Sequence, residues 1–209
     1  MKFEVKSAVL PLILINIAVF ILEFVLGNKF IGSFILTPDI FARPWILLTH
    51  MFLHAGVNHL ALNMYTLLIF GPLLEQRIGV KRFLSIYLAS GIIAGVISSF
   101  FYQSALGASA AIMGMIGILI ILMPDLRLLL FFVVPMPLWL VGIIYALFDI
   151  FGIFFPSGVG NIAHLTGMAM GLAYGFYLKK EKRKFDKKFH SKRHLEKNDI
   201  DEYLKNGRI

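Results

Sequence analysis

Ser109 lies in a run of small residues, 107–111, that begins a short apolar segment. Gly107 allows the backbone to approach another group closely. If a helix starts here, its first backbone N–H groups lack partners within the helix. Together with the N–H of Ala108, they could bind a developing oxyanion beside a serine nucleophile. Small residues in a membrane helix also form packing surfaces in which serine supplies a hydrogen bond, and the motif alone favours that interpretation.

Three other polar residues could act with Ser109. His164 could take the hydroxyl proton as general base and later protonate a leaving amine. His59 and Asn63 are four residues apart, so a helix would place them on one face, where both could donate to an oxyanion. The chemistry would be that of a Ser–His dyad. No acid is placed as a third member, and Asp149 is interpreted as a helix-end residue.

The composition is that of a multi-pass membrane protein. Of 209 residues, 58% are hydrophobic and 15% charged, and the mean hydropathy is +0.81; soluble domains are about 25% charged. The absence of cysteine excludes disulfides, a thiol nucleophile and a cysteine-bound metal. The net charge is +8, but residues 179–209 alone carry twelve Lys and Arg against six Asp and Glu. The membrane part is therefore nearly neutral, and the basic character belongs to a tail.

Helices that cross a bilayer must position the four polar residues, since about 20 apolar residues span the hydrocarbon core. We predict an all-α membrane protein with six transmembrane helices and a short central fourth helix, at residues 8–27, 57–75, 82–102, 107–123, 127–150 and 161–178. Pro135 and Pro137 predict a kink or break in the fifth helix. The aromatic connection 28–56 should lie in the membrane interface.

The distribution of Lys and Arg in the short loops sets the orientation. Both termini are expected in the cytoplasm of a cell-membrane protein, with one membrane domain, 1–178, and a basic cytoplasmic tail, 179–209. Ser109, His164 and the pair formed by His59 and Asn63 then lie near the outer starts of three helices, at similar depth. Close helix approach there would depend on small residues, which are Gly107, Gly114, Gly167 and Gly171.

Several motifs, taken in order, resemble those of the rhomboid intramembrane serine proteases over nearly all of residues 8–178. These motifs are Trp45, His50-x-x-x-His54-x-x-x-x-His59-x-x-x-Asn63, Glu75-x-Arg77-x-Gly79, Gly107-x-Ser109 and Ala163-His164-x-x-Gly167-x-x-x-Gly171. The resemblance implies a serine endopeptidase without cofactor or metal. Its partners would be the lipid bilayer and the transmembrane helices of other proteins, which it would cut beside small residues near the outer face.

The resemblance also implies roles for individual residues. Ser109 and His164 would form the catalytic dyad, and His59 and Asn63 would line the oxyanion hole. The sequence departs from the family pattern at three positions: Ala110 replaces a glycine after the serine, Met113 replaces a tyrosine, and Ile46 replaces an arginine after the tryptophan. None of these changes removes a group that the dyad needs.

Other candidate sites have simpler interpretations. His50, His54 and His59 could bind zinc, but no carboxylate completes a site, and a structural role in the loop is favoured. Glu23 is expected to pair with a loop or helix, and Glu75 with Arg77 to cap the cytoplasmic end of the second helix. The tail is expected to lie on anionic lipid headgroups, not nucleic acid, although a simple orientation signal explains it equally well.

Two other functions remain open. A catalytically inactive relative that binds transmembrane helices would need neither Ser109 nor His164. A small transporter or channel would place its polar residues at the membrane midplane, whereas those of this chain are predicted near one face.

Overall fold

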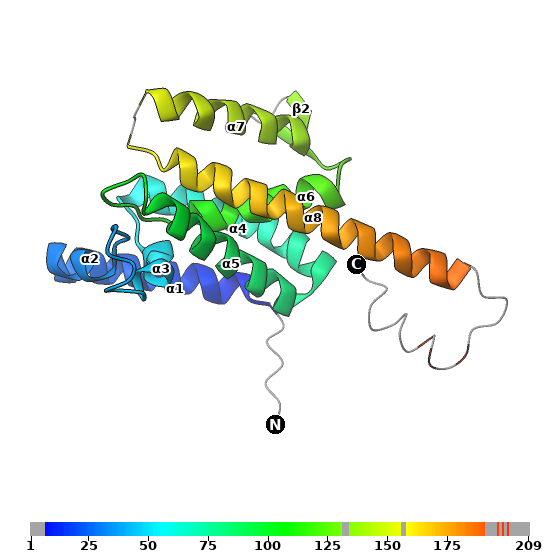
Figure 1. The fold of residues 1–209 in the computed structure, drawn as a ribbon, viewed down its shortest axis with the longest axis horizontal. Helices are drawn as coiled ribbons and strands as arrows, with labels where there is room; N and C mark the ends of the chain where they lie inside the picture. The colour runs from blue at the N-terminus through cyan, green and yellow to red at the C-terminus, as the bar shows by residue number, and fades with distance from the viewer. Residues whose placement is uncertain are drawn as a thin grey trace.

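The computed structural model describes residues 7–130, 134–155 and 158–190, together with Glu196, Asn198 and Ile200 (Figure 1). Its helices are α1 (Val9–Leu26), α2 (Asn28–Phe34), α3 (Ile46–Thr49), the 3-10 helix η1 (His50–Phe52), α4 (Val57–Ile78), α5 (Val80–Ser98), α6 (Ser109–Leu122), α7 (Leu138–Phe154) and α8 (Asn161–His190). Two strands, β1 (Arg127–Leu130) and β2 (Val134–Pro137), lie between α6 and α7. The described residues are mainly helical, as predicted, but the expectation of an all-α protein is wrong in detail because β1 and β2 are strands.

Among the helices that the structure describes, three are long and apolar enough to cross a membrane: α1, α4 and α5. They coincide with the predicted first three spans. The apolar helices α6 and α7 have 14 and 17 residues, or about 21 and 25 Å at 1.5 Å per residue. The count of six spans stays a prediction.

Helix α6 lies at the centre of the bundle. Every residue from Ala110 to Leu119 is buried, and α4, α5, α7 and α8 all pack against it. A helix that is apolar on all sides and buried on all sides needs no polar face. The structure therefore contains the short central helix expected from the sequence.

Glycines allow α6 and α8 to touch along their backbones. A side chain at Gly167 would overlap the carbonyl oxygen of Ala110, and one at Gly171 would overlap that of Gly114. A β-carbon at Gly117 would lie 2.6 Å from the Met168 carbonyl oxygen. Close backbone approach of this kind is how membrane helices gain van der Waals contact.

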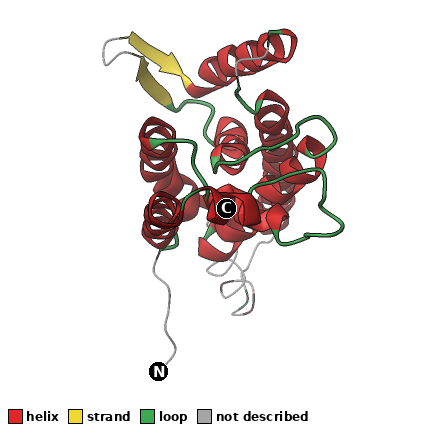
Figure 2. Ribbon diagram, turned by 90° about the vertical axis from the view of Figure 1, so that its left-hand side faces the viewer, coloured by secondary structure: helices red, strands yellow, loops and turns green. Residues whose placement is uncertain are grey.

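The expected fifth span at 127–150 is wrong in its first part. Residues 127–130 and 134–137 form an antiparallel hairpin in which Arg127 pairs with Pro137. Figure 2 shows this hairpin at the edge of the helical bundle. Pro135 and Pro137 explain the error, because each biases the residue before it towards an extended backbone and removes an N–H that a helix would use. Helix α7 begins only after Pro137.

The Gly91-x-x-x-Gly95 stripe of α5 receives the short 3-10 helix η1 instead of a long helix. A β-carbon at Gly91 would overlap the Met51 side chain, and one at Gly95 would lie 2.8 Å from Cε1 of His50. The connection between α1 and α4 is thus packed into α5.

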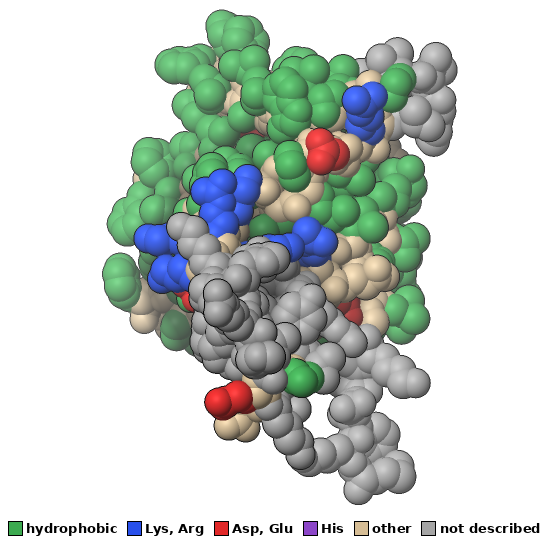
Figure 3. Space-filling view, turned by 90° about the vertical axis from the view of Figure 1, so that its right-hand side faces the viewer, with side chains coloured by type: hydrophobic (Ala, Val, Ile, Leu, Met, Phe, Trp, Pro, Cys, Tyr) green, Lys and Arg blue, Asp and Glu red, His purple; other side chains and the backbone are tan. Residues whose placement is uncertain are grey.

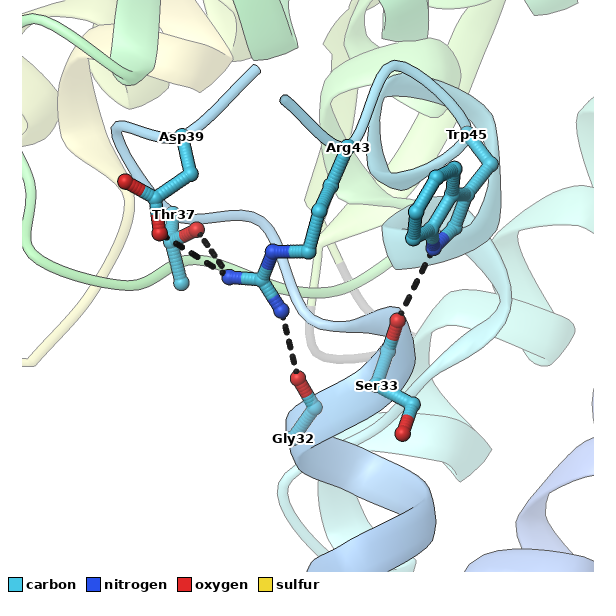
Figure 4. Close-up of polar contacts among 6 residues, drawn as sticks. All are labelled: Gly32, Ser33, Thr37, Asp39, Arg43 and Trp45. Carbon is cyan, nitrogen blue, oxygen red and sulfur yellow. Dashed lines mark hydrogen bonds and ion pairs between the residues drawn. The ribbon is translucent and has the colours of Figure 1, made fainter. Parts of the chain in front are cut away.

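Two side chains fasten the same connection to α2 (Figure 4). Arg43 donates from Nη1 to the Gly32 carbonyl at 3.0 Å and from Nη2 to the Thr37 hydroxyl at 2.7 Å. Trp45 donates from its indole N–H to the Ser33 carbonyl at 3.0 Å. The connection is therefore ordered by internal hydrogen bonds, and its position in the membrane interface stays a prediction.

The structure shows the hydrogen-bond partners of Glu23 and Glu75, for which the sequence predicts roles. Glu23 accepts the backbone N–H of His54 at 3.1 Å, so it pairs with the loop as expected. Glu75 accepts the Ala8 N–H at 3.1 Å and the Ser7 hydroxyl at 3.1 Å. It therefore caps the start of α1, and the expectation that it caps the end of its own helix is wrong.

Helix α8 extends well past the apolar bundle, through residue 190. Lys and Arg side chains gather on the end of the molecule from which it projects (Figure 3). The boundary predicted after residue 178 therefore lies inside a continuous helix.

Candidate active site

The hydroxyl of Ser109 and the imidazole of His164 are in direct contact. Ser109 Oγ lies 2.8 Å from His164 Nε2. Ser109 is the first residue of α6, and His164 lies in the first turn of α8, where its N–H donates to the Gly160 carbonyl at 3.0 Å. The glycine contacts between α6 and α8 begin one turn further along, and hold the two helices close enough for this hydrogen bond.

The backbone before Ser109 requires glycine. Gly107 has φ +119°, a conformation that other residues rarely adopt. Its N–H donates to the His50 carbonyl at 2.8 Å, and a β-carbon there would lie 2.7 Å from Cε1 of His59. Gly107 therefore lets the His59 ring lie beside the start of α6. Ala108 is fully buried and precedes the helix, whose first N–H groups have no acceptor within it.

A hydrogen bond from the backbone to Nδ1 orients the His59 ring. The Ala55 N–H points at His59 Nδ1, at 3.4 Å, so Nδ1 is an acceptor. In a neutral imidazole the other nitrogen then carries the proton. That nitrogen, Nε2, would lie 2.9 Å from a β-carbon at Gly107. The tautomer favoured by these contacts thus directs a donor towards the segment before Ser109.

Asn63 shares a helix face with His59, as the spacing predicted. Its Nδ2 donates to the His59 carbonyl at 3.0 Å, and only 6% of the residue is exposed. A side-chain amide has two N–H groups. One remains available when the other is bonded within the helix.

The second ring nitrogen of His164 contacts an acid that sequence reasoning missed. His164 Nδ1 lies 3.0 Å from Oδ1 of Asp149, on α7. The interpretation of Asp149 as a helix-end residue is wrong, because the helix continues to Phe154 and the carboxylate is buried. A signal was present: Asp149 is the one charged residue of a helix that is otherwise apolar, and ionisable groups in such helices are usually functional.

Two other contacts hold the start of α8. The Ile162 N–H donates to the Tyr102 hydroxyl at 3.0 Å. Gly152 of α7 leaves room for Asn161, whose Nδ2 would be 2.5 Å from a β-carbon at that position. Neither contact was foreseen, because tyrosine and asparagine are common at membrane interfaces and in turns. Together they position the turn that carries His164.

The two histidines of the connection are structural and neutral. Burial lowers the pKa of His50 to about 4, against a smaller opposing effect of its hydrogen bond to the Ile46 carbonyl. Burial and the nearby His59 lower the pKa of His54 to about 4. Within residues 7–130, 134–155 and 158–190, no three His, Asp or Glu side chains are grouped so that they could hold a metal ion.

The arrangement has the parts needed for acyl transfer. A hydroxyl bonded to an imidazole can be activated as a nucleophile. The first N–H groups of a central helix, beside an imidazole N–H, can stabilise an oxyanion. The transporter hypothesis gains no support, because these groups gather at helix starts.

Comparisons with known proteins all point to one family. The model of the Rhomboid domain matches residues 42–181. The chain is 36% identical over 146 residues to RHOMBOID-like protein 6, mitochondrial, of Arabidopsis thaliana. The aligned region covers 65% of this chain and 44% of that protein. It is 32% identical over 192 residues to Rhomboid protein 1, mitochondrial, of Saccharomyces cerevisiae, and the aligned region covers 86% of this chain and 55% of that protein. It is 33% identical over 152 residues to the putative rhomboid protease YdcA of Bacillus subtilis, and the aligned region covers 66% of this chain and 70% of that protein. The chain spans about half the length of the first two relatives.

Proposed function

This chain belongs to the rhomboid family, and on that premise we propose that it is an intramembrane serine endopeptidase that cleaves transmembrane segments of other membrane proteins. Ser109 is the nucleophile, and His164 is the general base and acid. The observation that carries the proposal is the 2.8 Å contact between Ser109 Oγ and His164 Nε2. An inactive relative that only binds helices has no need of this hydrogen bond.

The reaction follows from this contact. Ser109 Oγ attacks the carbonyl carbon of the scissile peptide, and its proton passes to His164 Nε2. The carbonyl oxygen becomes an oxyanion, which His59, Asn63 and the N–H of Ala108 stabilise. The C–N bond then breaks as His164 gives the proton to the departing amine. Water, activated by His164 in turn, hydrolyses the acyl-enzyme and releases Ser109.

The protein's setting is part of the proposal. It is a multi-pass protein of the cell membrane with six spans in residues 1–178 and both termini in the cytoplasm. The support is the gathering of basic side chains at one end of the molecule (Figure 3), since cytoplasmic segments are rich in Lys and Arg. Residues 179–209 form the basic tail, and its positive charge suits anionic lipid headgroups.

The function can be tested without a known substrate. A fluorophosphonate probe should label the detergent-solubilised protein, and peptide mapping should place the label on Ser109. Labelling should disappear in His164→Ala, because the base is lost, and persist in the matched variant His190→Ala, at the far end of α8. A folded wild-type protein that is never labelled would favour an inactive helix-binding relative.

Asn63→Ala should lower turnover with little effect on substrate affinity. The loss should be about 10- to 1000-fold in kcat, because one donor to an oxyanion is removed. The measurement is kcat and KM on a single-span reporter that the wild-type protein cuts. The matched control is Asn58→Ala, which changes an exposed asparagine on the first turn of the same helix. If Asn63→Ala lowers thermal stability alone, Asn63 is a packing residue.

A further inference from the structure

We propose that Asp149 is a positioning residue for His164, so that Ser109, His164 and Asp149 act as one unit. The inference rests on the proposed function of the Ser109–His164 pair. Two hydrogen bonds carry it, Ser109 Oγ to His164 Nε2 at 2.8 Å and His164 Nδ1 to Asp149 Oδ1 at 3.0 Å. The ring is therefore held at both nitrogens.

The carboxylate decides which nitrogen of His164 carries the proton. An ionised carboxylate only accepts hydrogen bonds, so Nδ1 must be the donor to Asp149. In the neutral ring Nε2 is then unprotonated, and its lone pair faces the Ser109 hydroxyl. A general base needs this tautomer. Without the acid, the neutral ring could place its proton on either nitrogen.

Burial adds an electrostatic role. Asp149 is 5% exposed, and its Oδ2 has no hydrogen-bond partner among the residues that the structure describes. A carboxylate in such surroundings is costly unless a positive group compensates it. When His164 takes the serine proton it becomes a cation 3.0 Å from that carboxylate. Asp149 therefore stabilises the charge that forms during attack.

Other ionisable groups lie near His164 and bear on its pH dependence. His59, on α4, is close enough to interact electrostatically with His164. Tyr102, which follows α5, bonds to the turn before His164. Ser109 on α6 and Asp149 on α7 are the direct partners. Among these four side chains, only Asp149 carries a carboxyl group, so its removal should dominate any change in the pH dependence.

The alternative is that the contact only fastens α7 to α8. Asparagine separates the two roles, because it matches aspartate in volume and can still hydrogen-bond to Nδ1. A fastening role predicts that Asp149→Asn is milder than Asp149→Ala. A positioning role predicts that Asp149→Asn is at least as damaging, because the amide N–H can donate to Nδ1 and hold the imidazole proton on Nε2, the wrong nitrogen.

The test uses the rate at which the full chain, in detergent micelles, is labelled by the fluorophosphonate probe. In that reaction the Ser109 Oγ–P bond forms, the P–F bond breaks, fluoride leaves, and the hydroxyl proton passes to His164. The rate therefore reports the base directly. Asp149→Asn should be labelled about 100- to 10,000-fold more slowly, with thermal stability close to wild type. Asp149→Glu should restore part of the rate, and the exposed-site control Asp125→Asn should change nothing.

The pH profile gives a second readout. Loss of the carboxylate destabilises the imidazolium. The acidic limb of the plot of labelling rate against pH should therefore move to lower pH in Asp149→Asn, while the rate is lower than wild type at every pH. A labelling rate within about threefold of wild type and an unmoved limb would overturn the inference while leaving Ser109 as nucleophile. A wild-type protein that is not labelled at Ser109 would instead overturn the proposed function.

A measurement on the wild-type protein covers the case in which the variants fail to fold. The 15N chemical shifts of the His164 ring distinguish its tautomers. Above the pH at which the ring is charged, we expect protonated Nδ1 and unprotonated Nε2. The opposite tautomer would rule out positioning by Asp149.

Discussion

Ser109→Ala should abolish cleavage of transmembrane substrates and leave the fold intact. The substitution removes one hydroxyl, whose hydrogen bond in the structure goes to His164. Its neighbours Ala108, Ala110 and Ala111 stay packed, so little contact area is lost. Without the nucleophile no acyl-enzyme forms, and the other groups of a serine hydrolase cannot replace it.

This result is measured in proteoliposomes with a single-span reporter that the wild-type protein cuts. The matched control is Ser104→Ala, which alters an exposed serine in the loop just before the motif and should keep full activity. Melting curves of both variants should overlay the wild type. Proteolysis above background in purified Ser109→Ala would mean that another residue is the nucleophile.

Gly167→Ala should reduce turnover by about 100-fold or more, although it adds only one methyl group. That methyl would overlap the carbonyl oxygen of Ala110 and lie 2.8 Å from its carbonyl carbon. Both atoms belong to the backbone of the central helix, so α8 must move instead. His164 lies one turn before Gly167, and a displacement of about 1 Å at a reacting group costs on the order of 100-fold.

The same substitution should lower the thermal midpoint by about 3–10 °C, because overpacking costs about 1–3 kcal/mol. Gly32→Ala is the matched control: a β-carbon at Gly32 meets nothing within 4 Å, so the midpoint and turnover should be retained. If Gly167→Ala behaved like this control, the close backbone contact between α6 and α8 would be wrong.

The two predictions depend on the sequence to different degrees. Ser109 and His164 stood out because polar residues in apolar segments are costly and therefore rare, which is a local property of the chain. Gly167 stood out as part of a small-residue stripe and of the motif that begins at Ala163. The backbone atom that it meets, the Ala110 carbonyl oxygen, could not be read from the stripe, and the similar stripe at Gly91 and Gly95 receives the short helix η1 instead of a long helix.

The hairpin before α7 was missed for a related reason. Hydropathy alone does not separate an apolar strand from an apolar helix, and residues 127–137 are apolar except for Arg127 and the prolines. Pro135 and Pro137 were correctly seen as a break. Whether the chain beyond the break kinks or turns back on itself depends on pairing between Arg127 and Pro137, ten residues away.

The sequence by itself determined the membrane class, the positions of most helices and the residue types able to do the chemistry. Tertiary structure alone decided the acid partners: Asp149 with His164, Glu23 with the His54 backbone, and Glu75 with the start of α1. In a soluble helix, the apolar stripe shows which side faces the core. Apart from Asp149, α7 is apolar on all sides, a pattern that suits lipid as well as a protein core because the two are equally apolar. Its sequence therefore cannot reveal that Asp149 turns towards α8; only packing sets that rotation.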